Sequence, residues 1–197
     1  MNYIIEPGKT NAPVFITLHG TGGDEHSLLP IGKELNANAT LIGIRGTVQE
    51  SGMNRYFRRL AEGLYDEQDL ELRGKELADF IYTLAEKHNF SLDQVVLIGY
   101  SNGANIAINL MLRDASFKKA VLLHPMYPIE VATPQHLKDT HTFMSFGQHD
   151  PIVSVEESKK VLNLFAENHG SVAHIWTVSH QLTYDEIAAA KKWLEAL

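Results

Sequence analysis

The chain has 197 residues, with 17 Lys and Arg against 24 Asp and Glu, and it contains no cysteine. The lack of cysteine excludes thiol nucleophiles, disulfides, iron–sulfur clusters and cysteine-based zinc sites. A formal charge of −7 disfavours nucleic acid as a partner, because that affinity rests mainly on neutralising phosphates. No apolar run approaches the ~18–20 residues of a membrane span, and no signal peptide is visible, so we expect a cytoplasmic protein without a membrane partner.

Short apolar runs predict β-strands that are covered on both faces, as in a parallel sheet. They span residues 14–18, 39–44, 95–98, 120–123, 143–146 and 173–178, with a weaker candidate strand at 3–5. Longer segments with helical character separate these runs. Alternating strands and helices predict a doubly wound, mostly parallel α/β sheet. No repeat or linker-like change in composition interrupts the chain, so we expect one domain over residues 1–197.

Three helices have recognisable signals. Apolar residues recur at helical spacing within 69–89, which predicts an amphipathic helix. Capping-box pairs predict two more helix starts. These pairs are Ser154 with Glu157 and Thr183 with Glu186. Gly170 is expected to end the helix that begins after Ser154.

The strand at 95–98 is followed by Gly99-Tyr100-Ser101-Asn102-Gly103 and then by a helical pattern. G-x-S-x-G between a strand and a helix is typical of a nucleophile elbow, a sharp turn that exposes the serine hydroxyl above the sheet. The glycines allow the strand and helix backbones to pass close to the serine. The alternative is a tight turn in which Ser101 only caps the helix.

A serine hydroxyl needs a base that takes its proton and an acid that orients the base. In this kind of fold the acid and then the histidine follow the serine along the chain. Asp150 and His180 each follow a predicted strand in the required order, among ten histidines in all. His124 and His149 also follow strands, but no downstream carboxylate supports either as the base. Asp150 before Pro151 has the alternative role of a turn residue.

The first glycine-rich loop, His19-Gly20-Thr21-Gly22-Gly23, follows the strand at 14–18. A hydrolase needs donors for the oxyanion that forms on the attacked carbonyl. The main-chain N–H groups of Thr21 and of Asn102, the residue after the serine, are the candidates. The alternative is a phosphate-binding loop. Against this alternative, the glycine spacing of the loop fits neither of the two common phosphate-binding motifs, and the acidic pair at 24–25 would repel phosphate.

Together these motifs resemble the α/β-hydrolase fold, in its carboxylesterase/phospholipase branch, which includes acyl-protein thioesterases. The match is nearest to small bacterial hydrolases described as MhqD-like, and three stretches carry it: 19–23, 55–63 and 99–105. The resemblance implies a catalytic triad of Ser101, His180 and Asp150, with Thr21 and Asn102 as oxyanion donors. Ser179 stands where such relatives usually have glycine before the histidine. A homodimer is an open expectation from the same resemblance.

Two segments are candidates for substrate contacts. Residues 47–68 form a long connection that contains Arg55, Tyr56, Phe57, Arg58 and Arg59. These side chains would wall the pocket or recognise an anionic group. The alternative is an aromatic anchor with solvated arginines paired to Glu62 or Asp66. Met126 and Tyr127, after another strand, are expected to supply an apolar wall. The connection at 125–141 is too short for a cap domain, so an open, shallow site is expected.

We therefore expect a serine carboxylesterase that cleaves esters of small molecules through an acyl-enzyme, without metal or cofactor. A thioesterase or a lysophospholipase would use the same residues. A non-catalytic binding module on the same fold is the alternative from another class, because fold alone does not establish function. The expected partner is a small-molecule ester.

Overall fold

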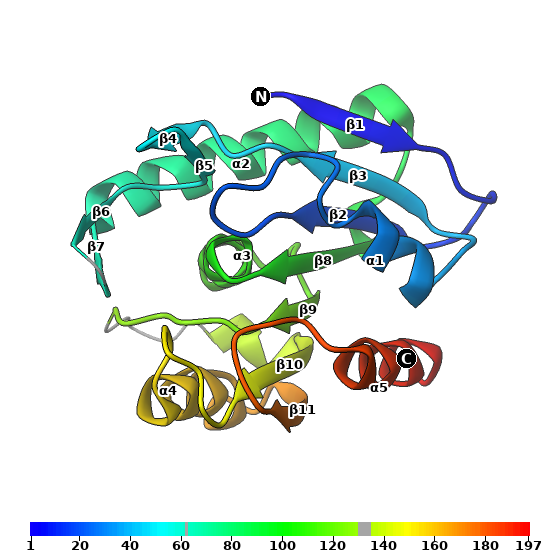
Figure 1. Ribbon diagram of the computed structural model, residues 1–197. Coiled ribbons are helices and arrows are strands. Elements are labelled where there is room, and N and C mark those ends of the chain that lie inside the picture. The colour runs from blue at the N-terminus through cyan, green and yellow to red at the C-terminus, as the bar shows by residue number, and fades with distance from the viewer. Residues whose placement is uncertain (62, 130–134) are drawn as a thin grey trace.

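The computed structural model describes residues 1–61, 63–129 and 135–197, and a seven-stranded sheet lies at its centre (Figure 1). The strand order is β1-β3-β2-β8-β9-β10-β11. These strands are β1 (Tyr3–Glu6), β2 (Val14–Leu18), β3 (Thr40–Ile44), β8 (Val95–Tyr100), β9 (Lys119–Leu123), β10 (His141–Gly147) and β11 (Ser171–Thr177). β1 pairs antiparallel with β3, and the other neighbours pair parallel. The predicted α/β class is confirmed, and so is the weak N-terminal strand.

The strands were predictable because they are buried on both faces. Every residue of β2 is buried, and its side chains alternate between two cores. Ile16 and Leu18 belong to one core, whereas Phe15 between them belongs to the other. Neither face of such a strand meets water, so the sequence has no polar alternation. Each fully buried aliphatic side chain contributes about 1.5–3 kcal/mol.

Helices cover both faces of the sheet (Figure 1). They are α1 (Leu29–Leu35), α2 (Glu67–His88), α3 (Asn102–Arg113), α4 (Val155–Ala166) and α5 (Tyr184–Glu195), with short 3-10 helices η1 (Leu92–Gln94) and η2 (Gln135–Asp139). Buried residues of α2, α3 and α4 share one core, and those of α1 and α5 share the other. The result is three layers, helices–sheet–helices. No helix in the described ranges is both long and apolar enough to cross a membrane.

The predicted helix signals are present with two differences. The Thr183–Glu186 pair forms a complete capping box at α5. The Ser154 hydroxyl accepts the Glu157 N–H at α4, but the Glu157 carboxylate binds Lys160 instead of closing the box. The expectation that Gly170 ends α4 is wrong. The helix ends at Ala166, and His169 takes the left-handed conformation with φ 63° before the chain enters β11.

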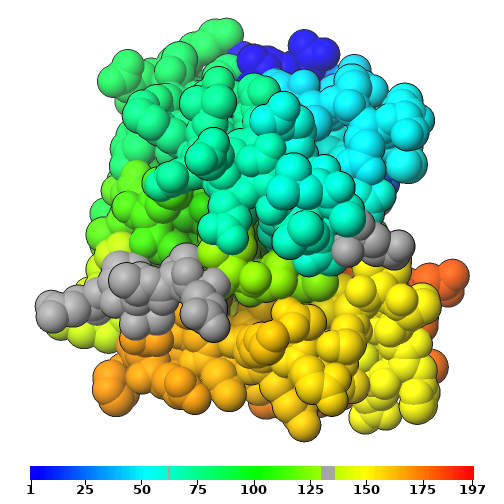
Figure 2. Space-filling model, turned by 90° about the vertical axis from the view of Figure 1, so that its left-hand side faces the viewer, coloured from blue at the N-terminus to red at the C-terminus, as the bar shows by residue number. Residues whose placement is uncertain are grey.

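Two small antiparallel hairpins between β3 and α2 were not predicted. They are β4 (Val48–Glu50) with β5 (Met53–Arg55), and β6 (Arg59–Ala61) with β7 (Leu64–Tyr65). In Figure 1 they lie near the carboxyl ends of the parallel strands. Figure 2 shows that face, with the hairpins in cyan and green above the yellow segment that contains α4. In the described part of the β9–β10 connection, η2 is the one helix.

Candidate active site

The candidate site lies where the parallel strands end. Ser101 directly follows β8, and Asp150 and His180 each come three residues after the end of β10 and β11. The pairing of β10 with β11 continues beyond the strands, because Gln148 N–H donates to Thr177 O at 2.9 Å and His149 N–H to Val178 O at 2.7 Å. The two loops therefore leave the sheet side by side. The side chains of Asp150 and His180, which these loops carry, therefore lie close together above the sheet.

Ser101, His180 and Asp150 form a continuous hydrogen-bonded chain. His180 Nε2 lies 2.9 Å from Ser101 Oγ, and His180 Nδ1 lies 2.6 Å from Asp150 Oδ2. A carboxylate only accepts, so it assigns the ring hydrogen to Nδ1 and leaves Nε2 free to accept the serine hydroxyl. The other oxygen, Asp150 Oδ1, accepts the N–H groups of Ile152 and Val153. The turn role expected as the alternative for Asp150 thus coexists with the contact to His180.

The turn around Ser101 requires both of its glycines. Ser101 has φ 50°, a left-handed conformation that L-residues other than glycine rarely adopt. A Cβ on Gly103 would lie 1.9 Å from Leu18 O, and one on Gly99 would lie 2.6 Å from Ala104 backbone atoms. The Ser101 side chain makes no capping hydrogen bond to α3. Its hydroxyl is therefore directed to His180, and the alternative of a helix-capping serine does not describe this turn.

Ser179, where relatives usually have glycine, does not adopt a positive φ. The position therefore has no conformational requirement for glycine. The His180 loop is instead held by Tyr100, whose hydroxyl donates to His180 O at 2.9 Å. The Tyr100 and His180 rings lie 5.5 Å apart.

The loop that carries Thr21 is held by buried His19. Gly46 N–H donates to His19 Nε2 at 3.0 Å, so the ring hydrogen is on Nδ1, which donates to Gly20 O at 2.7 Å. Burial lowers the pKa of His19, which keeps the ring neutral. The Thr21 hydroxyl accepts from Arg55 Nη1 at 2.8 Å. This loop and Asn102, at the start of α3, border the same cavity as Ser101.

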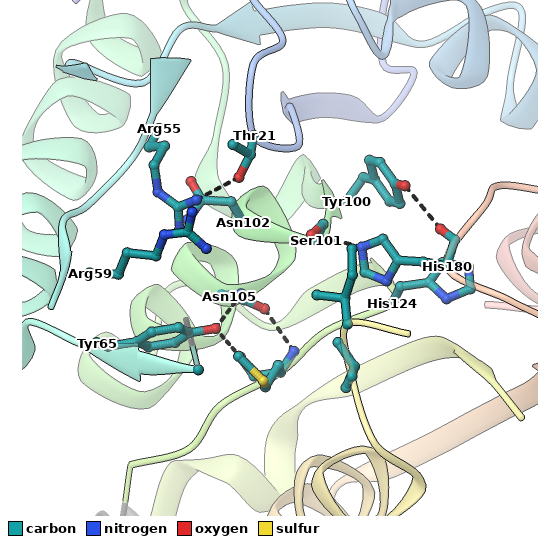
Figure 3. A pocket seen from close by; sticks show the side chains of 14 residues that line it. Thr21, Arg55, Arg59, Tyr65, Tyr100, Ser101, Asn102, Asn105, His124 and His180 are labelled. Atoms are coloured by element: carbon teal, nitrogen blue, oxygen red, sulfur yellow. Dashed lines mark hydrogen bonds between the residues drawn. The ribbon is translucent and has the colours of Figure 1, made fainter. Parts of the chain in front are cut away.

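That cavity has a volume of about 320 Å³, and its walls differ in chemistry (Figure 3). The wall around Ser101 consists of Tyr100, Ser101, His124 and His180. Thr21, Arg55, Arg59 and Tyr65 lie across the cavity from His180 and His124. Gly63 and Asn102 also line the cavity. The remaining lining residues are Asn105, Met126, Ile152 and Val153. A cavity of this volume fits a small ligand.

The family model described as Phospholipase/Carboxylesterase matches residues 1–197. The chain belongs to this family. It is therefore an α/β hydrolase of the carboxylic ester hydrolase class. The resemblance inferred from the motifs at 19–23, 55–63 and 99–105 is confirmed at the level of the family.

Individual relatives agree with this assignment. The chain is 42% identical to the hydrolase MhqD of Bacillus subtilis (strain 168) over 195 residues, which cover 98% of this chain and 97% of that protein. The crystal structure of the Bacillus cereus carboxylesterase matches with a TM-score of 0.95 and 40% identity over 100% of this chain and 94% of that one. The structure of YahD with malic acid matches with a TM-score of 0.94 and 32% identity, over 99% and 98% of the two chains.

In this carboxylesterase-family chain, three of the seven predicted substrate-contact residues, Arg55, Arg59 and Met126, line the cavity. The other four do not. Tyr56 is buried and donates its hydroxyl to Ile44 O, and the ring of Phe57 packs edge-on against Tyr65.

Arg58 points to solvent and pairs with Asp66 at 2.9 Å. Tyr127 is buried, and its hydroxyl accepts from Asn109. The residues at 55–59 therefore divide between the two expected roles. Tyr56, Phe57 and Arg58 form the aromatic anchor with a solvated arginine, whereas the arginines that line the cavity belong to its wall. The proposed Glu62 partner lies outside the described residues.

Several lining residues were not predicted. Tyr65 receives a hydrogen bond from Asn105 Nδ2 at 2.6 Å and donates to Met126 O at 3.2 Å, which connects three lining residues. Tyr100 and His124 each lie at the end of a strand, and that position was the available signal for them. Nothing in the sequence pattern marks Tyr65 or Asn105, because one lies in a short hairpin and the other in a helix.

A buried acid–histidine pair lies behind His180. His124 Nε2 lies 3.0 Å from Glu186 Oε2, and the His124 and His180 rings are 5.2 Å apart. Burial raises the pKa of Glu186, but its contacts with His124 and Ser145 outweigh burial, so the net pKa is lowered. Potential metal-ligand atoms of His124, Asp150 and His180 lie within 4.8 Å of one another. Asp150 and His180 already form a hydrogen bond with each other, and this bond accounts for the short distances between their potential ligand atoms.

Proposed function

We propose that this protein is a serine carboxylesterase in which Ser101 is the nucleophile, His180 the base and Asp150 the residue that orients the base. The observation that carries the proposal is the position of His180 between its two partners, 2.9 Å from the serine and 2.6 Å from the carboxylate. A hydroxyl becomes an effective nucleophile when a neighbouring base removes its proton during attack.

In the first half-reaction, Ser101 Oγ attacks the ester carbonyl while its proton moves to His180 Nε2. The main-chain N–H groups of Thr21 and Asn102 stabilise the oxyanion of the tetrahedral intermediate. The intermediate collapses, the C–O bond to the alcohol breaks, and His180 returns the proton to the leaving oxygen. The product of this half is an acyl-enzyme and a free alcohol.

In the second half-reaction, water attacks the acyl-enzyme and gives its proton to His180. The bond to Ser101 Oγ breaks, the proton returns to the serine, and the carboxylic acid leaves. Asp150 stabilises the imidazolium in both halves and stays ionised throughout. The cavity volume of about 320 Å³ supports a small ester as substrate. Small thioesters are compatible with the same steps, and no contact distinguishes them from oxygen esters.

Replacement of the nucleophile tests the proposal. Ser101→Ala should lower kcat/KM for 4-nitrophenyl acetate by at least about 10³-fold, because the acyl-enzyme cannot form. A fluorophosphonate probe should label the wild type at Ser101 and leave the variant unlabelled. The measurement is initial rates, with mass spectrometry of the labelled protein.

Ser116→Ala is a suitable control because Ser116 is a partly buried serine bonded to Tyr82, away from the cavity. It should keep the wild-type rate and labelling. Equal rates in the wild type and Ser101→Ala would refute the proposed nucleophile. An inert wild type that also resists the probe would favour the non-catalytic binding module. A series of acyl chain lengths separates a short-chain esterase from a lysophospholipase.

A further inference from the structure

The cavity wall opposite Ser101 carries an excess of positive charge. Arg55 and Arg59 both line the cavity and share one carboxylate, that of Glu50. Arg55 Nε lies 3.3 Å from Glu50 Oε2, and Arg59 Nε lies 2.8 Å from Glu50 Oε1. Among the described residues of this wall, two guanidinium groups and one carboxylate leave one net positive charge. No Asp or Glu is among the described residues that line the cavity.

The charge of Arg55 is poorly solvated. The Arg55 side chain is only 6% exposed. Burial lowers its pKa, and the nearby charge of Arg59 lowers it further. Arg55 nevertheless stays protonated, because a guanidinium is not deprotonated in proteins. Two like charges near each other in a partly buried wall are stabilised when an anion lies between or beside them.

Unused donors face the same space. Arg59 uses only Nε, and Arg55 uses Nε and Nη1, in the contacts of the described residues. Asn102 Oδ1 accepts the Tyr56 N–H at 2.8 Å. The other terminal atom of the Asn102 amide is therefore the NH₂ nitrogen, Nδ2. Asn102 Nδ2 is buried and has no hydrogen-bond partner. A buried donor without a partner is destabilising, and no acceptor among the described residues reaches this group, so an acceptor on a ligand would satisfy it.

These three residues converge on one side of the cavity. Figure 3 shows both guanidinium groups beside Asn102, across the cavity from His180 and His124. Asn102 follows Ser101 in the chain, so an acceptor held by its amide lies next to the reacting centre. The donors are thus arranged for a ligand that carries a second polar group within a few bonds of the ester.

We propose that Arg55, Arg59 and Asn102 form a subsite for a carboxylate on the substrate, so that the protein prefers esters that bear an additional ionised carboxyl group. This rests on the function proposed above. The two oxygens of a carboxylate match the planar fork of a guanidinium, and its single charge balances the single excess charge of the wall. Hydrolysis of such an ester leaves the subsite carboxylate unchanged and releases the new acid and the alcohol.

Two pairs of esters that differ by one charge test this preference. Mono(4-nitrophenyl) adipate and methyl 4-nitrophenyl adipate carry the difference on the acyl side. 4-Acetoxybenzoate and methyl 4-acetoxybenzoate carry it on the leaving group. The wild type should show a higher kcat/KM for the charged member of at least one pair, with the difference mainly in KM. The structure does not commit the subsite to one side of the ester, so either pair supports the proposal.

Arg59→Gln removes one charge from the wall. In the pair that shows the preference, the ratio of charged to neutral kcat/KM should fall by about 10- to 100-fold, as expected for charge-assisted hydrogen bonds. Arg59→Lys should recover most of the ratio. Arg73→Gln is the matched control, because Arg73 has nearly the same exposure (29% against 30%) and a carboxylate partner but does not line the cavity. It should keep the wild-type ratio.

A wild-type measurement keeps the test independent of folding in the variants. Monomethyl adipate should inhibit 4-nitrophenyl acetate hydrolysis at lower concentration than dimethyl adipate does. Equal inhibition, preference for the neutral member of both pairs, or an unchanged ratio in Arg59→Gln would overturn the subsite. None of these results affects the proposed nucleophile, whose failure would instead appear as full activity in Ser101→Ala.

Discussion

His19 illustrates how one side chain can support a reactive loop without taking part in the reaction. Its two ring nitrogens bind Gly46 N–H and Gly20 O, so the ring must stay neutral and in one tautomer to keep both contacts. Protonation would turn Nε2 into a donor facing another donor. The loop that carries the proposed oxyanion donor Thr21 therefore depends on a histidine that resists protonation.

This dependence predicts a pH effect on stability. The pKa of His19 is lowered from its ordinary value of 6.5 in the folded chain. At a pH above 6.5 the ring is neutral in both the folded and the unfolded chain, and His19 makes its full contribution to the free energy of unfolding. As the pH falls below about 6.5, the unfolded chain binds a proton that the folded chain refuses, so the free energy of unfolding decreases.

His19→Gln isolates this contribution from the other histidines. At pH 7.5 the variant should lose about 1–3 kcal/mol, because glutamine lacks the Nδ1–H that donates to Gly20 O. The gap in free energy of unfolding between wild type and variant should narrow as the pH falls from 7.5 to 5. Urea unfolding at several pH values measures it. A gap that stays constant with pH would show that His19 does not titrate with folding.

The arginine run shows what could not be predicted from neighbouring residues alone. Arg58 and Arg59 are adjacent, yet Arg58 pairs with Asp66 in solvent while Arg59 lines the cavity. Adjacent side chains of an extended segment point to opposite sides, and the pairing of β6 with β7 adds a register shift between Arg59 and Ala61. Such a shift depends on tertiary contacts and has no sequence period.

The strands of the central sheet were easier to predict than the hairpins. β2, β8, β9 and β10 are continuous apolar runs because both of their faces are buried. β4 to β7 have two or three residues each and lie outside the large sheet, so no periodicity distinguishes them. Helix α1 was missed for a related reason, since seven residues with Pro30 in the first turn make too short a pattern.

The candidate site was accessible to prediction because its position follows from topology. Ser101, Asp150 and His180 each come just after a parallel strand, and the carboxyl ends of such strands meet at one edge. The geometry brings these three together, while their catalytic roles remain the proposal to be tested. The rest of the cavity comes from hairpins and helix faces, and its residues could not be assigned from strand ends.

The elbow between β8 and α3 predicts a steric effect. Gly103→Ala would place a Cβ 1.9 Å from Leu18 O, so the backbone of β2 or α3 must shift. We expect a loss of at least about 1–3 kcal/mol, together with slower fluorophosphonate labelling of Ser101, because the turn would move the hydroxyl away from His180. Urea unfolding and labelling rates measure the two effects.

Gly52→Ala is the control for this substitution. A Cβ at Gly52 meets no atom within 4 Å, and its φ of 79° adds only local strain of about 1–2 kcal/mol. Its labelling rate should match the wild type. If Gly103→Ala labels as fast as Gly52→Ala, the tight packing of the elbow does not position the nucleophile.

Across the molecule, the composition and the cavity have opposite charge. The chain has a formal charge of −7, whereas the described lining contains two arginines and no carboxylate. Net charge therefore describes the surface that repels polyanions and says little about the ligand of a pocket. The extent of the single domain over 1–197, the homodimer and the cytoplasmic location remain predictions.

The absence of cysteine in the whole chain predicts resistance to thiol reagents. N-ethylmaleimide at pH 7 should leave esterase activity unchanged, whereas a fluorophosphonate should remove it, because the proposed nucleophile is a hydroxyl. Residual activity after each treatment is the measurement. Inhibition by the maleimide would point to a modified amine or histidine near the cavity. It would contradict the expectation that only modification of the serine inactivates the enzyme.

The side-by-side arrangement of the loops after β10 and β11 also has a consequence for folding. Ser101 obtains its turn from β8 and α3, which are neighbours in the chain, but its hydrogen bond to His180 spans 79 residues. Contacts between such distant segments form slowly, after local structure. Until the edge strand β11 has docked, the serine is an ordinary alcohol without a base. Catalytic competence would then appear only with completion of the sheet, so partly folded chains would carry the nucleophile in an inert form.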